Sequence, residues 1–181
     1  MAEKFSKIHP EEVKIEIINK MHNVKDFTSY EPDLVDFLRD DALENQNQTL
    51  SVTFLCFYQN SLVSYLTLLT DRITLEGDLR EYFREKGIHY KSLPALKIGR
   101  LCVDDNFRVR GLGKNMIKFA IKTAKEINQS KAGCRFITVD AKRNPNKGLD
   151  SLQFYKKLGF QVTGDDAASK ITFMHLDIKL T

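Results

Sequence analysis

The stretch LKIGRLCVDDNFRVRGLGKNMIKFAIKTA, residues 96–124, decides the fold. Its start is an apolar run typical of a strand, and its end repeats apolar residues at the spacing of one helix face. The segment RVRGLGK, residues 108–114, joins the two and contains two glycines and three cationic side chains. Glycine lets a ligand approach the backbone closely, and the first amides of a helix have no partner within the helix. The order strand, glycine-rich turn and helix therefore predicts a site for an anion.

Two common phosphate-binding patterns do not fit this segment. A P-loop that ends on the Gly-Lys pair requires glycine at position 108 and Ser or Thr at 115, where the chain has Arg108 and Asn115. A dinucleotide fingerprint starting at Gly111 requires Gly or Ala at position 116 and finds Met116. Residues 108–113 instead have the spacing R-x-x-G-x-G and are followed by a predicted helix. Backbone amides and cationic side chains in this arrangement can hold a diphosphate.

The hydrophobic pattern on either side predicts a single mixed α/β domain over residues 1–181. Strands are expected at 13–20, 50–58, 61–73, 93–103, 134–141 and 171–180, and helices at 30–46, 75–87, 111–127 and 149–159. The two strands at 50–73 form a hairpin that turns around Gln59–Ser61. Pro94 is expected at or before the start of its strand.

Composition and cysteine spacing exclude several protein classes. Hydrophobic residues at 42% and charged residues at 29% fit a globular protein, and no apolar run is long enough to span a bilayer. Residues 1–17 mix charge throughout and lack the apolar region of a signal peptide. Cys56, Cys102 and Cys134 stand singly among apolar neighbours, which favours buried thiols over a disulfide framework or a zinc site. We therefore expect a cytoplasmic protein with no membrane segment, and no residue cluster has the spacing of metal ligands.

The net charge of +4 conceals an asymmetry along the chain. Residues 1–50 contain 6 Lys/Arg and 11 Asp/Glu, whereas residues 91–160 contain 16 Lys/Arg and 5 Asp/Glu. The basic excess surrounds the glycine-rich segment and would concentrate anionic ligands there. One stripe of the following helix is formed by Lys114, Lys118, Lys122 and Lys125. This stripe is read either as a solvated face or as a track for RNA phosphates.

Residues 96–124, together with FYKKLGF at 154–160, resemble the GNAT superfamily of acetyl-CoA-dependent N-acetyltransferases. In that superfamily a strand ending in a run like LCVD precedes a Q/R-x-x-G-x-G/A loop, and a later FYxxxGF closes the core. The resemblance covers residues 50 to 178. It implies a GNAT-like α/β (α+β) fold with a mixed, mostly antiparallel sheet of about six to seven strands flanked by about four to five helices. The phrase at 93–113 is also similar to the acetyltransferase toxins of toxin–antitoxin pairs, which act on the amino acid of charged tRNA.

The resemblance implies a role for each matching residue. The end of the strand bonds the pantetheine arm of acetyl-CoA through its backbone, the loop binds the diphosphate, and Tyr155 protonates the leaving thiolate as general acid. The cofactor-binding residues implied in this way are Leu101, Cys102, Val103, Arg108, Val109, Arg110, Gly111, Leu112, Gly113 and Lys114. Relatives often carry an asparagine seven residues before the tyrosine, where this chain has Gly148. Asn144 or Asn146 is a candidate substitute.

The proposed chemistry requires a neutral amine, a polarised carbonyl and a protonated leaving thiolate. An amide near Val103 could polarise the thioester carbonyl. An α-amine has a pKa of about 7.7–8.0 and is appreciably neutral at pH 7, whereas a lysine at about 10.4 would favour a dedicated base. The strand position expected for such a base carries Arg100, which favours an α-amine. His89, Glu44 and Asp140 are further candidates for a base.

Three functions are left open by these residues. The first is an N-acetyltransferase that acts on a small-molecule or protein amine by direct attack in a ternary complex. The second is a toxin that acetylates aminoacyl-tRNA and has tRNA and an antitoxin as partners. The third is a non-catalytic acetyl-CoA-binding or regulatory module that keeps the fold and has lost turnover, and the intact Tyr155 argues against it. No metal is expected, the Asp104–Asp105 pair is interpreted as a turn, and a homodimer is left open.

Overall fold

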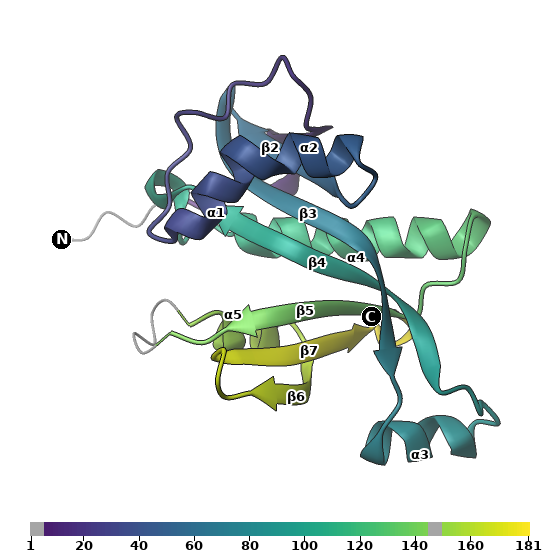
Figure 1. Ribbon diagram of the computed structural model, residues 1–181. Coiled ribbons are helices and arrows are strands. Elements are labelled where there is room, and N and C mark those ends of the chain that lie inside the picture. Colours follow the sequence, from purple (N-terminus) through teal and green to yellow (C-terminus); the bar gives the residue numbers. More distant parts are fainter. Residues whose placement is uncertain (1–5, 145–149) are drawn as a thin grey trace. The chain divides into compact units, whose positions relative to one another are not determined.

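The computed structural model describes residues 6–144 and 150–181 (Figure 1). The chain groups into two compact units. The first contains Met1–Leu69 and Ile98–Ala120, and the second contains Thr70–Lys97 and Ile121–Thr181. Three long elements pass from one unit into the other, and each unit is described separately below. The expectation of one domain over residues 1–181 stays a prediction.

The described residues form a mixed α/β fold with a seven-stranded sheet, as predicted. Its strands are β1 (Val13–Ile17), β2 (Val52–Tyr58), β3 (Ser61–Thr74), β4 (Ser92–Val103), β5 (Phe136–Lys142), β6 (Gln161–Asp166) and β7 (Ile171–Asp177), in the order β1-β2-β3-β4-β5-β7-β6. Its helices are α1 (Pro32–Asp36), α2 (Ala42–Asn47), α3 (Gly77–Glu85), α4 (Leu112–Ser130) and α5 (Ser151–Lys157). The pairings β1–β2, β2–β3, β5–β7 and β6–β7 are antiparallel.

In the first unit, the hairpin of β2 and β3 packs against the helical segment at residues 32–47 (Figure 1). Gln59 and Asn60 form the hairpin turn with φ of 49° and 64°, the left-handed pair that a two-residue hairpin favours. A π-helical stretch, Phe37–Asp41, joins α1 to α2. The Tyr65 hydroxyl donates a hydrogen bond of 2.6 Å to the Leu34 carbonyl in α1. Tyr65 thereby anchors the helical segment on β3.

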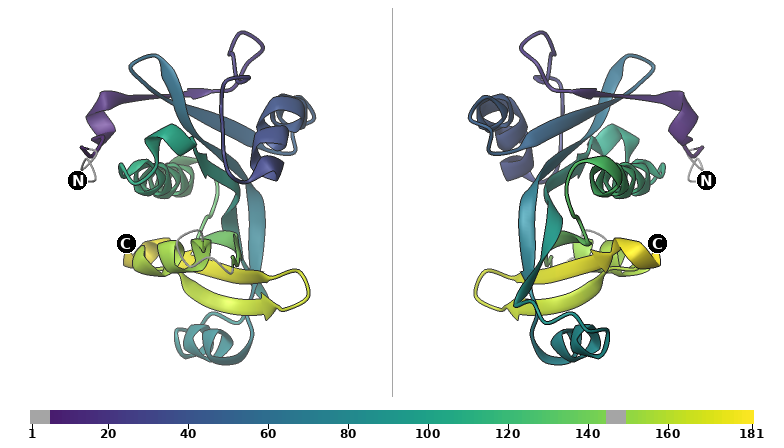
Figure 2. Two further views of the ribbon diagram at one scale, coloured as in Figure 1. Left: turned by 90° about the vertical axis from the view of Figure 1, so that its left-hand side faces the viewer. Right: turned by 90° about the vertical axis from the view of Figure 1, so that its right-hand side faces the viewer.

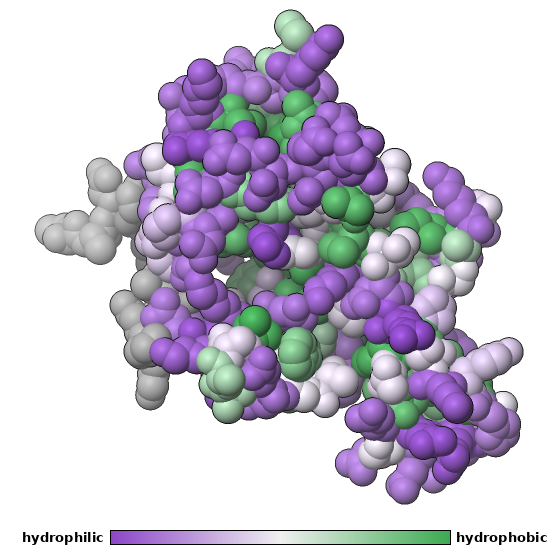
Figure 3. Space-filling view, viewed as in Figure 1, coloured by the Kyte–Doolittle hydropathy of each residue, from purple (hydrophilic) through white to green (hydrophobic). Residues whose placement is uncertain are grey.

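The second unit is built on the pairing of β5, β7 and β6, and α5 contacts β5 (Figure 2). Its core includes Phe83 from α3 and Phe136 from β5, which are fully buried with ring centroids 5.8 Å apart. The other side of α3 presents hydrophilic side chains on the face shown in Figure 3. Arg135 and Asp177 form a bidentate ion pair with distances of 2.8 and 2.6 Å. This pair ties the start of β5 to the end of β7.

The structure corrects several of the predicted boundaries. Strand β6 was not predicted, because its exposed polar residues, with a register shift between Val162 and Gly164, show no alternating hydrophobic pattern. Pro94 lies inside β4, where its carbonyl accepts a hydrogen bond from the Arg135 amide at 2.9 Å. The helix expected at 30–46 contains the π-helical stretch. Within the described residues, no helix combines the length and the hydropathy that crossing a membrane requires.

Candidate functional site

The glycine-rich loop, defined here as Arg108–Gly111, has a strained backbone. Val109 has φ of 64° and Gly111 has φ of 89°, both in the left-handed region. That region is unfavourable for a β-branched residue, and the Val109 side chain is 94% exposed, so its own packing does not hold it there. Helix α4 begins directly afterwards with Leu112, which is buried.

The backbone amides of residues 108–114 form a row of available donors. No described residue accepts a hydrogen bond from them, whereas the next amide, that of Asn115, donates to the Gly111 carbonyl at 3.1 Å. The first turn of a helix adds partial positive charge at the same end. Gly113 is half-buried in this turn and Lys114 is exposed. The predicted loop residues therefore lie together, with their amides able to bind an anion.

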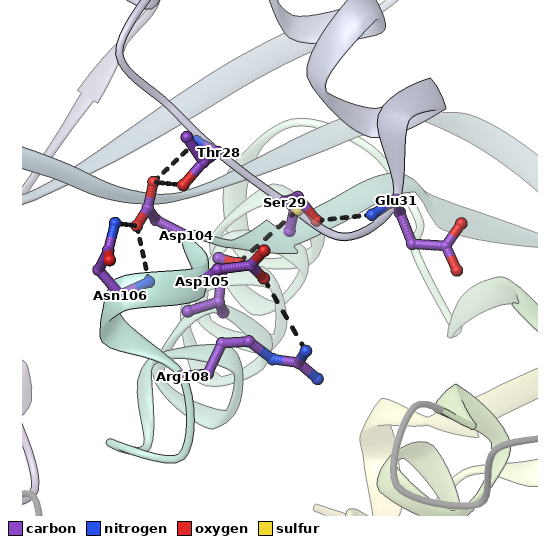
Figure 4. Close-up of polar contacts among 9 residues, drawn as sticks. Thr28, Ser29, Glu31, Asp104, Asp105, Asn106 and Arg108 are labelled. Atoms are coloured by element: carbon purple, nitrogen blue, oxygen red, sulfur yellow. Dashed lines mark hydrogen bonds and ion pairs between the residues drawn. The ribbon is translucent and has the colours of Figure 1, made fainter.

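The entry to the loop is fixed by a buried carboxylate. Asp104 is 3% exposed and accepts hydrogen bonds from the Thr28 amide (2.8 Å) and hydroxyl (3.1 Å), as Figure 4 shows. It also accepts from the Asn106 amide (2.9 Å) and side chain (3.0 Å). The Asp105 amide donates back to the Thr28 carbonyl at 3.1 Å. The interpretation of this acidic pair as a turn is confirmed. Among the described residues, no group of three acidic, histidine or cysteine side chains could hold a metal ion.

The side chains of the two loop arginines have different surroundings. The Arg108 guanidinium lies 4.3 Å from the centre of the Tyr30 ring. It also pairs with the Asp105 carboxylate (Figure 4), at a distance of 3.9 Å. The Arg110 Nε donates to the Ser6 carbonyl at 3.0 Å, and its guanidinium lies over the Phe107 ring at 5.7 Å. Arg108 is thus at the surface beside an exposed tyrosine, whereas Arg110 holds the N-terminal part of the chain.

At the end of β4, the three predicted residues alternate in exposure. Cys102 is buried in the core of the first unit, while Leu101 and Val103 are half-buried on the opposite face of the strand. Burial raises the pKa of the Cys102 thiol to about 11, so the thiol stays protonated. Arg100 shares the face of Cys102 and lies over the Phe37 ring at 5.0 Å. The position at which a base was expected thus carries an exposed cation.

In the second unit, Tyr155 is buried on α5. Its ring packs edge-on against Phe154 and Phe160, with centroid distances of 5.1 and 5.3 Å. Burial alone raises its pKa above the ordinary value, because no charged group or hydrogen bond contributes. The phenol is therefore fully protonated near neutral pH. The ring of Tyr155 is part of the core, so only its hydroxyl is available for proton transfer.

The other residues considered as a possible base lie in different surroundings, and their role stays a prediction. His89 and Glu44 are exposed, and Glu44 accepts a hydrogen bond from the Gln48 side chain at 2.8 Å. Asp140 forms an ion pair of 2.7 Å with Lys97. Asn144 is half-buried after β5, while Asn146 and Gly148 lie outside the described residues.

Sequence reasoning missed three residues that hold the loop. They are Thr28, whose partner Asp104 is 76 residues away, and the pair Ile8 and Asn115, which are 107 residues apart. Asn115 was noted only as a mismatch to the P-loop pattern. Its role depends on a contact so distant in sequence that no local spacing indicates it.

Comparisons with known proteins found a matching family model and several similar proteins. A family model described as an acetyltransferase (GNAT) domain matches residues 71–162. A tRNA-acetylating toxin of Mycobacterium tuberculosis is 27% identical over 152 residues, which are 82% of this chain and 84% of the relative. The solved structure of AtaT complexed with acetyl-methionyl-tRNAfMet has a TM-score of 0.75 at 19% identity, covering 93% of this chain and 96% of that chain. A tyrosine-to-phenylalanine mutant of AtaT, bound to the C-terminus of the antitoxin AtaR and acetyl-CoA, has a TM-score of 0.70 at 18% identity, covering 93% and 95%.

Proposed function

Because the chain belongs to the GNAT acetyltransferase domain family, we propose that it transfers the acetyl group of acetyl-CoA to the α-amine of an aminoacyl-tRNA. The observation that carries this proposal is the likeness to a tRNA-acetylating toxin along 82% of the chain. It favours the tRNA acceptor over the small-molecule or protein amine that the residues alone suggested first. By the same likeness, the chain acts as the toxin of a toxin–antitoxin pair and has an antitoxin as its partner.

In this proposal, the glycine-rich loop and the first turn of α4 bind the diphosphate of acetyl-CoA. Two observations support this assignment. The backbone amides of residues 108–114 have no acceptor among the described residues, and Gly111, with its positive φ and no side chain, leaves the backbone accessible to the diphosphate. A solved relative of the same fold holds acetyl-CoA, which makes this coenzyme the natural ligand to test. The backbone of Leu101, Cys102 and Val103 is assigned to the pantetheine arm.

The transfer itself requires one bond to form and one to break. The amine nitrogen attacks the thioester carbonyl carbon, the carbon–sulfur bond breaks, and the leaving thiolate takes up a proton. Tyr155 is assigned as the donor of that proton. Its buried phenol is protonated at neutral pH, but burial also makes it a weaker acid, so donation requires the hydroxyl to be held close to the leaving sulfur. The amine loses one proton as the amide forms, and that proton restores the phenol of Tyr155, so the proton count balances. An α-amine, with a pKa of about 7.7–8.0, needs no strong base, which agrees with Arg100 at the expected base position.

The acceptor assignment has independent support from exposed and half-buried cations of the first unit. The Arg108 guanidinium lies beside the exposed Tyr30 ring, a pair on which an RNA base could stack, and Arg100 adds an exposed cation whose aromatic partner Phe37 is buried. In the lysine stripe of α4, the Lys125 ammonium donates to the Thr181 carbonyl and Lys122 lies 3.8 Å from Glu126. Lys114 and Lys118 are exposed and are the members of the stripe assigned to RNA phosphates.

The experiment that tests this function is acetyl transfer from labelled acetyl-CoA to bulk charged tRNA. Uncharged tRNA, free amino acids, polyamines and peptides serve as competing acceptors in parallel reactions. We expect N-acetylaminoacyl-tRNA as the product, identified by mass spectrometry after nuclease digestion. Transfer to peptides or polyamines with none to charged tRNA would contradict the acceptor and restore the first hypothesis. Acetyl-CoA binding with no transfer to any acceptor would indicate the non-catalytic module.

A further inference from the structure

The N-terminal segment Ser6–Ile8, called here the strap, contacts the far end of the glycine-rich loop. The Ile8 amide donates to the Arg110 carbonyl at 2.9 Å, and the Arg110 Nε donates to the Ser6 carbonyl at 3.0 Å. The Asn115 side chain, one turn into α4, donates to the Ile8 carbonyl at 3.0 Å. Ile8 itself is 3% exposed, so the strap is packed as well as hydrogen-bonded. All of these atoms lie in the first unit.

These contacts hold the residue that follows Val109, whose backbone is strained. Val109 has φ of 64° and an exposed side chain, so its conformation is imposed by its neighbours. A strained backbone persists only where the surroundings fix it. Asp105 is held to Thr28 before the loop, and Arg110 is held to Ile8 after it. Both ends of the loop are therefore fixed by residues from the first 28 positions of the chain.

We propose that the strap positions the diphosphate-binding loop, with Asn115 and Ile8 as positioning residues for acetyl-CoA. This inference rests on the proposed function and adds to it a role for residues that carry none of the family's motif. A loop already held in its binding conformation loses less freedom when the anion binds. Asn115 therefore affects the coenzyme through Ile8, while its side chain is engaged with the strap.

The test is Asn115→Ala in the full chain, with two ligands compared by calorimetry. Acetyl-CoA carries the diphosphate, whereas S-acetylpantetheine keeps the thioester arm and lacks it. We expect the Kd for acetyl-CoA to rise about tenfold, with the Kd for S-acetylpantetheine and the kcat at saturating acetyl-CoA unchanged. An unchanged Kd for acetyl-CoA, or an equal loss for both ligands, would overturn the proposal. If the wild-type chain bound no acetyl-CoA, the proposed function would fail first and separately.

Asn128→Ala on the same helix is the matched control. Its side-chain carbonyl accepts from the Cys134 amide at 3.3 Å, so the control also removes one side-chain to backbone hydrogen bond. We expect it to lower the melting temperature about as much as Asn115→Ala and to leave the Kd for acetyl-CoA unchanged. A double-mutant cycle of Asn115→Ala with Arg110→Ala completes the design. Loss of affinity in the double variant that equals the sum of the single losses would contradict a shared strap, because residues acting through one segment are coupled.

Discussion

The buried carboxylate of Asp104 binds both the backbone amide and the hydroxyl of Thr28, and so joins the end of β4 to a segment 76 residues earlier. The same carboxylate caps the turn that leads into the glycine-rich loop through the Asn106 amide. A side chain that only accepts hydrogen bonds fits these partners, since all four contacts are made by donors.

Replacing Asp104 by Asn should therefore destabilise the protein. The amide nitrogen of asparagine is a donor, so at least one of the four partners would face a second donor and stay unsatisfied. We expect a loss of about 1–3 kcal/mol in the free energy of unfolding, measured by urea denaturation. Asp105→Asn is the control, because that exposed carboxylate contacts only Arg108 at 3.9 Å among the ion pairs of the described residues. Equal losses in the two variants would contradict the role assigned to Asp104.

Gly111 and Gly87 allow the effect of backbone strain to be separated from the effect on the coenzyme. Both have positive φ, 89° and 73°, and an added Cβ would meet nothing within 4 Å in either place. Valine at either position should lower the unfolding free energy by about 1–2 kcal/mol, because the left-handed conformation disfavours a side chain. Only Gly111→Val should also weaken acetyl-CoA binding, since its Cβ would crowd the diphosphate. Equal acetyl-CoA affinity in the two variants, measured by calorimetry, would remove Gly111 from the site.

The fold was largely predictable because its signals are local. Residues 96–124 combine an apolar run, two glycines and a helical repeat, and the structure has β4, the loop and α4 at these positions. The π-helical stretch at Phe37–Asp41 was not predicted, because the apolar repeat at residues 30–46 indicates a helix but carries no local mark of a π-helical turn. Strand β6 was not predicted, because its exposed and polar residues show no alternation of apolar and polar side chains.

The candidate site was predicted only where its chemistry lies in one segment. The row of amides and Gly111 follows from the R-x-x-G-x-G spacing, whereas the contacts of Arg110 with Ser6 and of Asn115 with Ile8 join residues more than 100 positions apart. Sequence reasoning assigned the Arg110 guanidinium to the diphosphate as a charged supplement. In the structure it donates to a backbone carbonyl and lies over an aromatic ring, so its charge is already partly engaged.

Because His175 is buried, we expect the free energy of unfolding to fall in mild acid. Its side chain is 5% exposed on β7, its Nδ1 lies 2.7 Å from the Thr163 hydroxyl, and burial lowers its pKa below 6.5 despite the opposing effect of Asp177. The unfolded chain therefore binds the proton first as the pH falls. Stability is fully present above pH 6.5 and decreases below it until the folded pKa is passed, with a slope of at most about 1.4 kcal/mol per pH unit.

The measurement is the free energy of unfolding between pH 7.5 and 5 in wild type and His175→Gln. We expect the variant to be less pH-dependent in this range, because it lacks the group whose pKa differs between the two states. His89→Gln is the control, since that side chain is exposed. A variant at position 175 with the wild-type slope would show that the acid sensitivity arises elsewhere.

Tyr155→Phe separates the two roles that the structure permits for this residue. The phenylalanine ring keeps the edge-on packing with Phe154 and Phe160, and the hydroxyl that is lost contributes no hydrogen bond to the pKa of the group. We therefore expect the melting temperature and the Kd for acetyl-CoA to stay close to the wild-type values. The kcat should fall by about 10²–10⁴, the contribution of a positioned general acid. Single-turnover transfer to charged tRNA measures this directly, and a variant with wild-type kcat would leave Tyr155 with core packing as its function.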